Sequence, residues 1–267
     1  MNLNGVFLIT DADGTILTDD KRILDADRAA VRELTESGGL FTIATGRGLT
    51  LARVVARALE LEFPAVIFNG AAVYDFTREC FLWRHTLPEA AKDYVLRVRE
   101  RFPEIGAEIL RGDEVYVIST NSLEEGHLAF GAVEPIRCSF EEVPPDDWIK
   151  VLLVDEPEVI DEVIAFMDGN SFGETHLVRS SPIFYEMLAF GVDKGSGMMK
   201  LLELMGISGR YVVAAGDFMN DLEMLRAADL GVAVSNAEEA VKKEAGLVVC
   251  DNNSGAIRDI VEYLKKL

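Results

Sequence analysis

Short apolar runs alternate with amphipathic segments at both ends of this chain, and that alternation limits the folds it can adopt. In the first third of the chain, apolar runs of strand length are separated by segments with helical spacing. Strands that are apolar throughout are typical of parallel sheets with both faces covered. The expected strands are 6–10, 40–44 and 65–68, and the expected helices are 25–37 and 49–59.

The same pattern returns near the C-terminus. The expected strands there are 211–215, 231–234 and 247–250, and the expected helices are 195–205, 221–227, 237–245 and a last one that begins at 256. Because successive strand–helix–strand units place parallel strands side by side, a series of them builds one sheet with helices on both faces. The two ends together therefore predict a single doubly wound parallel sheet, an α/β core of Rossmann-like type.

Hairpins dominate the middle of the chain instead. We expect helices after Pro88 and Pro157, and strands over 107–110, 114–119, 149–154, 176–179 and 183–188. A mixed α+β segment within a parallel α/β domain indicates a second domain, entered and left through two linkers. The chain has 267 residues, 49% of them hydrophobic, which is enough for two ordinary domains. The predicted domains are a core of residues 1–85 and 190–267 and an inserted α+β domain of residues 86–189.

The acidic composition narrows the possible partners. The chain has 26 basic and 46 acidic residues, a net charge of −20. This charge repels nucleic-acid backbones and anionic lipids, so neither nucleic acid nor membrane is expected as a partner. It also repels a small phosphate ester. A phosphate site on this protein must therefore carry its own cation, either a metal ion or a placed lysine.

Location and redox state follow from what the sequence lacks. No apolar run is long enough to span a membrane, and no basic segment precedes the first apolar run, so we expect a cytoplasmic protein. The three cysteines, Cys80, Cys138 and Cys250, lie far apart and lack the spacing of metal ligands. They are expected to be reduced.

Two aspartates directly follow the first expected strand. Asp11 and Asp13 therefore lie at the carboxyl edge of the sheet, where ligands bind in doubly wound folds. Carboxylates so close together repel each other unless a cation or proton lies between them, and a hard divalent ion such as magnesium is the natural partner. Taken alone, the segment could equally be a solvated turn with a helix cap.

Three other segments place polar groups at the same edge. Thr45 and Gly46 follow the second strand and could hold phosphate oxygens, although a helix cap explains Thr45 equally well. Lys194 begins a helix after the inserted domain, where an isolated lysine is usually a surface residue. Asp217 and Asp221 follow the strand at 211–215, a second acidic turn that could bind metal.

These four segments, in this order, resemble the four motifs of the haloacid dehalogenase superfamily. Within it, an insert between the second and third motifs resembles the α/β cap of the Cof-type phosphatases, also called subfamily IIB. Residues 68–71 and 234–237 are similar to that branch as well, so the resemblance covers nearly the whole chain. The motifs read Asp11-Ala12-Asp13-Gly14-Thr15, Ala44-Thr45-Gly46-Arg47, Gly191-Val192-Asp193-Lys194-Gly195 and Gly216-Asp217-Phe218-Met219-Asn220-Asp221.

The resemblance implies a function and a mechanism. The enzyme would be a magnesium-dependent phosphatase that hydrolyses a small phosphorylated metabolite, such as a sugar phosphate. Asp11 would take the phosphoryl group as an aspartyl-phosphate, and Asp13 would serve as general acid and base. Asp13 also favours phosphoester chemistry, because a dehalogenase has no leaving alcohol to protonate and the transport ATPase signature has threonine at this position.

The resemblance further implies the ligands of phosphate and metal. The expected phosphate-binding residues are Ala12, Thr45, Gly46, Lys194 and Asn220. The expected metal site consists of Asp11, Asp13 through its carbonyl, Asp217 and Asp221, with Asp221 behind the direct ligands and Mg²⁺ as the cofactor. Arg47 could contact substrate or the inserted domain, or form a salt bridge within the core, and is not assigned to the site.

Two other functions are compatible with the same residues. A phosphosugar mutase of the same superfamily would return the phosphoryl group to the substrate rather than to water. A non-catalytic signalling module could bind magnesium and phosphate through the same residue types, but such receiver domains are about half this length and lack the insert. The partner is expected to be a small phosphorylated molecule, and the protein a monomer or weak homodimer.

Overall fold

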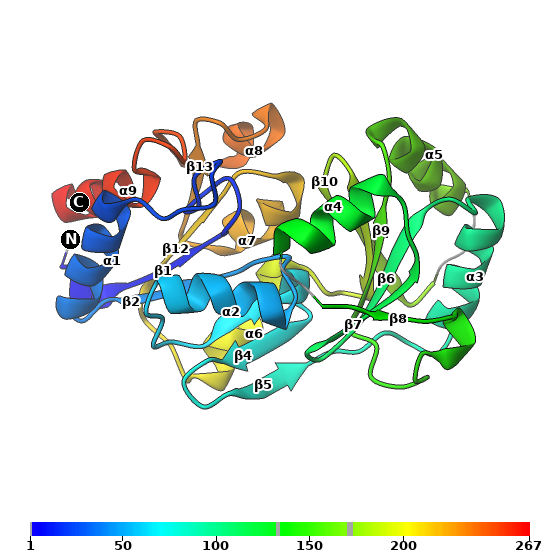
Figure 1. The fold of residues 1–267 in the computed structure, drawn as a ribbon. Coiled ribbons are helices and arrows are strands. Elements are labelled where there is room, and N and C mark those ends of the chain that lie inside the picture. Colours follow the sequence, from blue (N-terminus) through cyan, green and yellow to red (C-terminus); the bar gives the residue numbers. More distant parts are fainter. Residues whose placement is uncertain (1, 132–133, 170–172) are drawn as a thin grey trace. The chain divides into compact units, whose positions relative to one another are not determined.

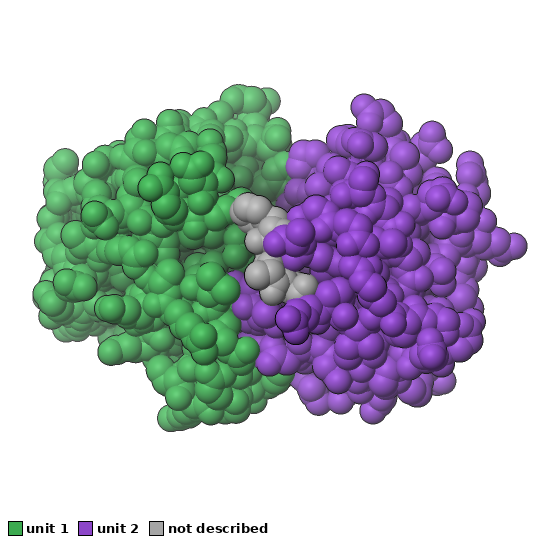
Figure 2. All heavy atoms as spheres, viewed as in Figure 1, with its two compact units in different colours: residues 1–47, 52–83, 193–267 green, residues 48–51, 84–192 purple. Residues whose placement is uncertain are grey.

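The computed structural model describes residues 2–131, 134–169 and 173–267. The chain divides into two compact units, which Figure 2 colours separately. Unit 1 comprises Met1–Arg47, Ala52–Trp83 and Asp193–Leu267, and unit 2 comprises Gly48–Leu51 and Arg84–Val192. The chain therefore leaves unit 1 and returns to it, as an inserted domain requires. No helix in the described ranges is long and apolar enough to cross a membrane.

Unit 1 contains the predicted parallel sheet (Figure 1). Its strands lie in the order β14-β13-β12-β1-β2, and every neighbouring pair is parallel. The strands are β1 (Val6–Thr10), β2 (Leu40–Ile43), β12 (Tyr211–Gly216), β13 (Leu230–Val234) and β14 (Leu247–Val249). All five agree with the expected strands to within a residue at either end. Strands from the two ends of the sequence, β1 and β12, are neighbours in the middle of the sheet.

Amphipathic helices cover this sheet. They are α1 (Asp25–Glu36), α2 (Leu49–Ala58), α6 (Lys194–Leu204), α7 (Leu222–Ala227), α8 (Glu239–Glu244) and α9 (Ala256–Lys266). In α9, Ile257, Ile260, Val261 and Leu264 recur at helical spacing and are all buried, which fixes the face that packs inward. Figure 1 shows α9 beside α1. Helix α6 instead packs with α7, in a core cluster with Phe7 and Ile9 of β1.

The third predicted parallel strand is only partly correct. Residues 65–68 were expected to extend the parallel sheet. The strand that forms, β3 (Ala65–Ile67), makes a single parallel bridge, between Ala44 and Val66, and pairs along its length with an antiparallel strand. That strand, β4 (Ala72–Asp75), and the next, β5 (Cys80–Arg84), were not predicted, and they complete a three-stranded sheet. Phe68 leaves the strand because it begins a tight 3-10 turn, η2 (Phe68–Gly70).

Unit 2 is built on a six-stranded sheet with the order β10-β11-β9-β6-β7-β8, antiparallel except for the last pair. Its strands are β6 (Gly106–Arg111), β7 (Glu114–Ser119), β8 (Ile136–Arg137), β9 (Lys150–Val154), β10 (Thr175–Ser181) and β11 (Phe184–Ala189). Its helices are α3 (Ala91–Arg101), α4 (Ser122–Gly131) and α5 (Pro157–Asp168). The sequence reading missed β8 and α4, and it placed the other elements correctly.

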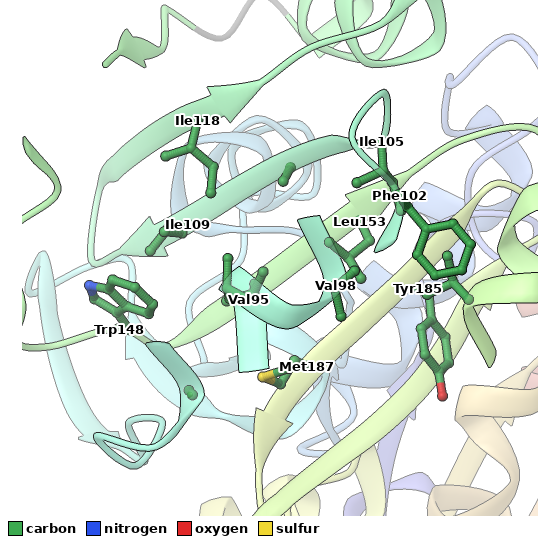
Figure 3. Close-up of a cluster of buried hydrophobic side chains, with 14 of the residues drawn as sticks. Val95, Val98, Phe102, Ile105, Ile109, Ile118, Trp148, Leu153, Tyr185 and Met187 are labelled. Carbon is green, nitrogen blue, oxygen red and sulfur yellow. The ribbon is translucent and has the colours of Figure 1, made fainter. Parts of the chain in front are cut away.

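Helices α3 and α5 bury their apolar sides on one face of this sheet. Figure 3 shows Val95 and Val98 of α3 near Leu153 and Met187, which come from two neighbouring strands. Proline can begin a helix because its missing N–H would have no partner there, and Pro157 stands at the first position of α5. Unit 2 thus has a hydrophobic core of its own. It remains a prediction that residues 1–85 and 190–267 form one functional domain and residues 86–189 another.

Candidate active site

The aspartate after β1 lies at the centre of the carboxyl edge of the sheet. Its backbone N–H donates to the carbonyl of Ala215 at 2.8 Å, so the ladder between β1 and β12 continues one residue beyond β1. The Asp11 side chain is buried, with the residue only 5% exposed. Because β12 is the neighbouring strand, the acids that follow it are brought to the same place. The structure thus joins segments about two hundred residues apart in the sequence.

A buried lysine binds two of these acids. Lys194 is the first residue of α6, which is capped by Asp193 through a hydrogen bond from the Ser196 N–H at 2.7 Å. Its Nζ donates to Asp11 Oδ1 at 2.5 Å and to Asp221 Oδ1 at 2.6 Å, and the residue is 1% exposed. Burial favours the neutral amine, but the two carboxylates outweigh it and raise the pKa of Lys194 above its usual value. The lysine is therefore a fixed cation, not a surface residue.

Three carboxylates gather around this lysine. Asp11, Asp217 and Asp221 each offer an oxygen within 4.8 Å of the others. Asp221 has little left to offer a metal, since its Oδ1 accepts from Lys194 and its Oδ2 accepts from the N–H groups of Asp217 and Phe218 at 2.9 and 3.0 Å. Asp217 accepts from the Thr15 hydroxyl at 2.8 Å. Asp11 and Asp217 are thus the better placed of the three for direct ligation.

The electrostatics of the cluster fit a divalent cation. Burial, followed by the charges of Asp221 and Asp217, raises the pKa of Asp11 well above its usual value despite the contact with Lys194. Burial and the charge of Asp221 raise the pKa of Asp217 to about 7. One lysine therefore leaves a surplus of negative charge, which a hard cation with oxygen ligands would neutralise. A Cβ at Gly14 would lie 2.5 Å from Asp217 Oδ2, so glycine leaves this carboxylate the space it occupies.

Asp13 has a different environment from Asp11. Its side chain is 40% exposed and is held by Arg47, whose Nε and Nη2 donate to its two oxygens at 2.7 and 2.8 Å. Lys21 Nζ donates to the same carboxylate at 2.7 Å. Although burial would raise the pKa of Asp13, these hydrogen bonds and charges hold it far below its usual value. The salt bridge anticipated for Arg47 is therefore made, and made to a predicted catalytic residue, whereas Lys21 was missed because no motif marks it.

The predicted phosphate-binding residues line the same edge of unit 1. Ala12 and Thr45 are buried, and the Thr45 N–H donates to the Val66 carbonyl at 2.9 Å. The Thr45 hydroxyl accepts from the Arg47 N–H at 3.1 Å, which leaves its own hydrogen for a ligand. The Asn220 Nδ2 donates to Asn69 Oδ1 at 2.9 Å. The Ala12 carbonyl accepts from the Leu17 N–H at 2.9 Å.

Asn69 was not among the predicted site residues. Its side chain lies against Gly46, since a Cβ built there would be 2.9 Å from both Asn69 Oδ1 and Nδ2. The same side chain accepts from Asn220. The signal in the sequence was the resemblance of residues 68–71 to the Cof-type branch, which gave no role to any of them.

The fold and this site define an enzyme of the α/β class, with acids and a buried lysine at the carboxyl edge of a parallel sheet. A model of the haloacid dehalogenase-like hydrolase family matches residues 8–261. The chain belongs to that family. The predicted Rossmann-like α/β fold is confirmed, as is the prediction of a Cof-type hydrolase of the phosphatase class.

Relatives match over nearly their full length. A phosphoglycolate phosphatase of Methanopyrus kandleri is 31% identical and is aligned over 97% of this chain and 96% of its own. A 5-amino-6-(5-phospho-D-ribitylamino)uracil phosphatase of Bacillus subtilis is 26% identical, over 95% of this chain and 93% of its own. The crystal structure of the Thermotoga maritima protein TM0651 superposes with a TM-score of 0.81 at 26% identity, covering 96% of each chain.

A solved sugar phosphatase of subclass IIB, BT4131, has the same fold. It superposes with a TM-score of 0.84 at 24% identity, covering 98% of this chain and 99% of its own.

Proposed function

We propose that this protein is a magnesium-dependent phosphomonoester hydrolase that acts on a small phosphorylated metabolite, such as a sugar phosphate, through an aspartyl-phosphate on Asp11. The observation that carries the proposal is the buried bridge from Lys194 to Asp11 and Asp221, with Asp217 beside it. The names of the relatives support the substrate class, since they include phosphatases of small phosphorylated molecules.

Asp11 is suited to attack phosphorus because it is buried, bonded to a cation, and fixed by the strand before it. The side chain has one oxygen, Oδ1, bonded to Lys194. The other oxygen can attack a phosphorus atom, forming the new P–O bond as the bond to the leaving alkoxide breaks. Lys194 then neutralises charge that develops on the transferred group.

Asp13 is proposed to protonate the leaving group and then to deprotonate the water that hydrolyses the aspartyl-phosphate, a role that contributes roughly 10² to 10⁴ in rate. In the structure its carboxylate is ionised and shared between Arg47 and Lys21. An ionised carboxylate is the form that accepts the proton of the attacking water. To donate a proton to the leaving group, Asp13 must first be protonated, which requires that its contact with Arg47 or with Lys21 be broken.

The metal is proposed to be Mg²⁺, held by Asp11, Asp217 and the Asp13 carbonyl, with Asp221 fixing the positions of Lys194 and of the loop that carries Asp217. When bound, it would neutralise the surplus negative charge and let a phosphate dianion approach this acidic protein. The hydroxyl of Thr45, the amides of Ala12 and Gly46, and the side chain of Asn220 are proposed to bind the phosphate oxygens.

The two predicted domains are proposed to have different roles in catalysis. Residues 1–85 and 190–267 carry every proposed catalytic residue, and the inserted residues 86–189 are proposed to select the leaving group. A cytoplasmic location, the absence of a nucleic-acid or membrane partner, and a monomeric or weakly dimeric state stay predictions.

The test is release of inorganic phosphate from p-nitrophenyl phosphate and from a panel of phosphorylated metabolites, with and without Mg²⁺. We expect release only with Mg²⁺, and none from Asp11→Asn. Asp25→Asn, which changes an exposed aspartate of α1, is the matched control and should retain full activity. Equal activity in Asp11→Asn would reject the nucleophile, and conversion of a sugar phosphate to an isomer without phosphate release would indicate a mutase.

A further inference from the structure

The turn between β3 and β4 has an unusual backbone. Three consecutive residues have positive φ: Phe68 at 53°, Asn69 at 52° and Gly70 at 101°. Side chains with a Cβ rarely adopt this conformation, and such residues persist where the surrounding structure holds them, often at functional sites. Phe68 and Asn69 are both buried. The contacts of the turn show what it holds.

The turn is bonded to the segment after β2. The Asn69 N–H donates to the carbonyl of Thr45, and the Phe68 N–H donates to the carbonyl of Arg47, both at 3.0 Å. The Asn69 side chain lies against Gly46, where a Cβ would lie 2.9 Å from both Asn69 Oδ1 and Nδ2. One side of the turn is therefore fixed to the predicted phosphate-binding segment.

The turn also meets two more of the four segments of the site. A Cβ at Gly70 would lie 1.9 Å from the Asp193 carbonyl oxygen and 3.1 Å from the Lys194 nitrogen, so the turn packs directly on the start of α6. The Asn69 Oδ1 accepts from the Asn220 Nδ2 at 2.9 Å. Three residues thus connect the loops of Thr45, Lys194 and Asn220, which are distant in the sequence.

We propose that Asn69 is a positioning residue that sets the orientation of the Asn220 carboxamide; the inference rests on the proposed phosphatase function. A carboxamide can turn over and exchange its donor and acceptor ends. An acceptor held in place selects the Nδ2 end, and the Asn69 carboxamide is held because the residue is 1% exposed and its side chain packs against Gly46, while its backbone is bonded to Thr45. The second N–H of Asn220 is then available to a phosphate oxygen or to a metal-bound water.

Asparagine combines two properties that this position needs. It tolerates positive φ better than other residues with a Cβ, apart from aspartate. Its side chain supplies a neutral acceptor, whereas aspartate would add negative charge beside the predicted phosphate ligands Gly46 and Asn220. Glycine would keep the backbone and its hydrogen bond to Thr45 while removing the whole carboxamide, and with it the acceptor for Asn220. This makes Asn69→Gly the informative variant.

The experiment is a double-mutant cycle with Asn69→Gly, Asn220→Ala and the two combined, measured by kcat and KM for the best substrate in Mg²⁺. We expect Asn69→Gly to lower kcat/KM by about 10- to 100-fold, the usual effect of losing a group that orients a ligand residue. It should divide this loss between kcat and KM as Asn220→Ala does, and the double variant should lose no more than Asn220→Ala alone. Glu60→Gly, an exposed positive-φ residue, is the control and should be unchanged.

Multiplicative losses in the cycle, or less than a twofold effect of Asn69→Gly, would overturn the inference. The side-chain NH₂ resonances of Asn220 in a ¹⁵N–¹H spectrum give a readout that does not depend on turnover. They should shift in Asn69→Gly and stay in place in Glu60→Gly. If the wild-type protein released no phosphate, the proposed function would fail, and the spectra would still decide whether Asn69 holds Asn220.

Discussion

Replacing Gly70 with alanine tests whether the 68–70 turn is a close structural support of α6. Two costs add. An L-residue at positive φ costs roughly 1–2 kcal/mol, and forcing a methyl group into packed surroundings costs typically 1–3 kcal/mol. The methyl group would lie 1.9 Å from the Asp193 carbonyl oxygen, which belongs to the backbone and cannot rotate away as a side chain could. We therefore expect Gly70→Ala to lower the free energy of unfolding by about 2–5 kcal/mol.

A second glycine separates these two costs. Gly209 has a φ of +72°, but no atom lies within 4 Å of the position that a Cβ would take there. Gly209→Ala should therefore lose only the conformational part, roughly 1–2 kcal/mol. Urea unfolding of both variants should show a difference of about 1–3 kcal/mol, which is the clash alone. Gly70→Ala should also lose phosphatase activity as the start of α6 shifts, while Gly209→Ala keeps it. Equal stability of the two variants would refute the reasoning.

Three other results are expected. Lys194→Met leaves Asp11 and Asp221 buried without their cation, so the metal-free protein should lose roughly 3–5 kcal/mol of unfolding free energy at pH 8. It should regain part of this loss at pH 5, because burial raises the pKa of Asp11 and that carboxylate then takes up a proton; unchanged urea midpoints would contradict this. Magnesium should raise the melting temperature, with about 2.7 kcal/mol gained at one hundred times the dissociation constant. This rise in melting temperature should shrink below pH 7, because the pKa of Asp217 is raised to about 7 and protons then compete with the metal. An equal rise in the Asp217→Asn variant would show that Asp217 is not a metal ligand. In unit 2, burial and the neighbouring carboxylate of Glu108 raise the pKa of Glu124 from 4.5 to about 10, so the folded state holds a proton that the unfolded chain releases. Stability should therefore fall as the pH rises from 4.5 to about 10, and Glu124→Gln should lessen that fall; an unchanged pH dependence of urea unfolding would contradict a buried, protonated Glu124.

The parallel sheet could be predicted because its strands carry a strong local signal. β1 and β12 are apolar throughout and end in acidic turns, so both their class and their direction follow from the sequence. The strands of the three-stranded sheet carry a weaker signal. β4 ends in Asp75, and β5 contains Trp83 and Arg84, half-buried and exposed, in place of a continuous apolar run. The antiparallel pairing of β3 with β4 follows from the 68–70 turn that joins them, whose positive φ values cannot be read from Phe68 or Asn69.

The site was predictable as a set of residue types but not as a set of contacts. The positions of Asp11 and Asp217 follow from strand ends that share one edge of a sheet, and that of Lys194 from the start of a helix. The pairing of Asp13 with Arg47 and Lys21 depends on how the loop after β1 folds back, and no pattern in the sequence specifies that path. The hydrogen bond from Asn220 to Asn69 depends on a contact between side chains that are 151 positions apart in the sequence.

The central claim is that Asp11 takes the phosphoryl group, and one measurement tests it directly. The wild-type protein and the Asp13→Asn variant are mixed with substrate and Mg²⁺ and quenched in acid within the first turnover; the variant should slow hydrolysis of the intermediate. Each sample is then digested, and the mass of the peptide that contains Asp11 is measured by mass spectrometry. We expect this peptide to gain the mass of one phosphoryl group, the gain to persist longer in Asp13→Asn, and no gain in Asp11→Asn. Turnover with no phosphorylated Asp11 peptide, or with the phosphoryl group on another residue, would contradict it.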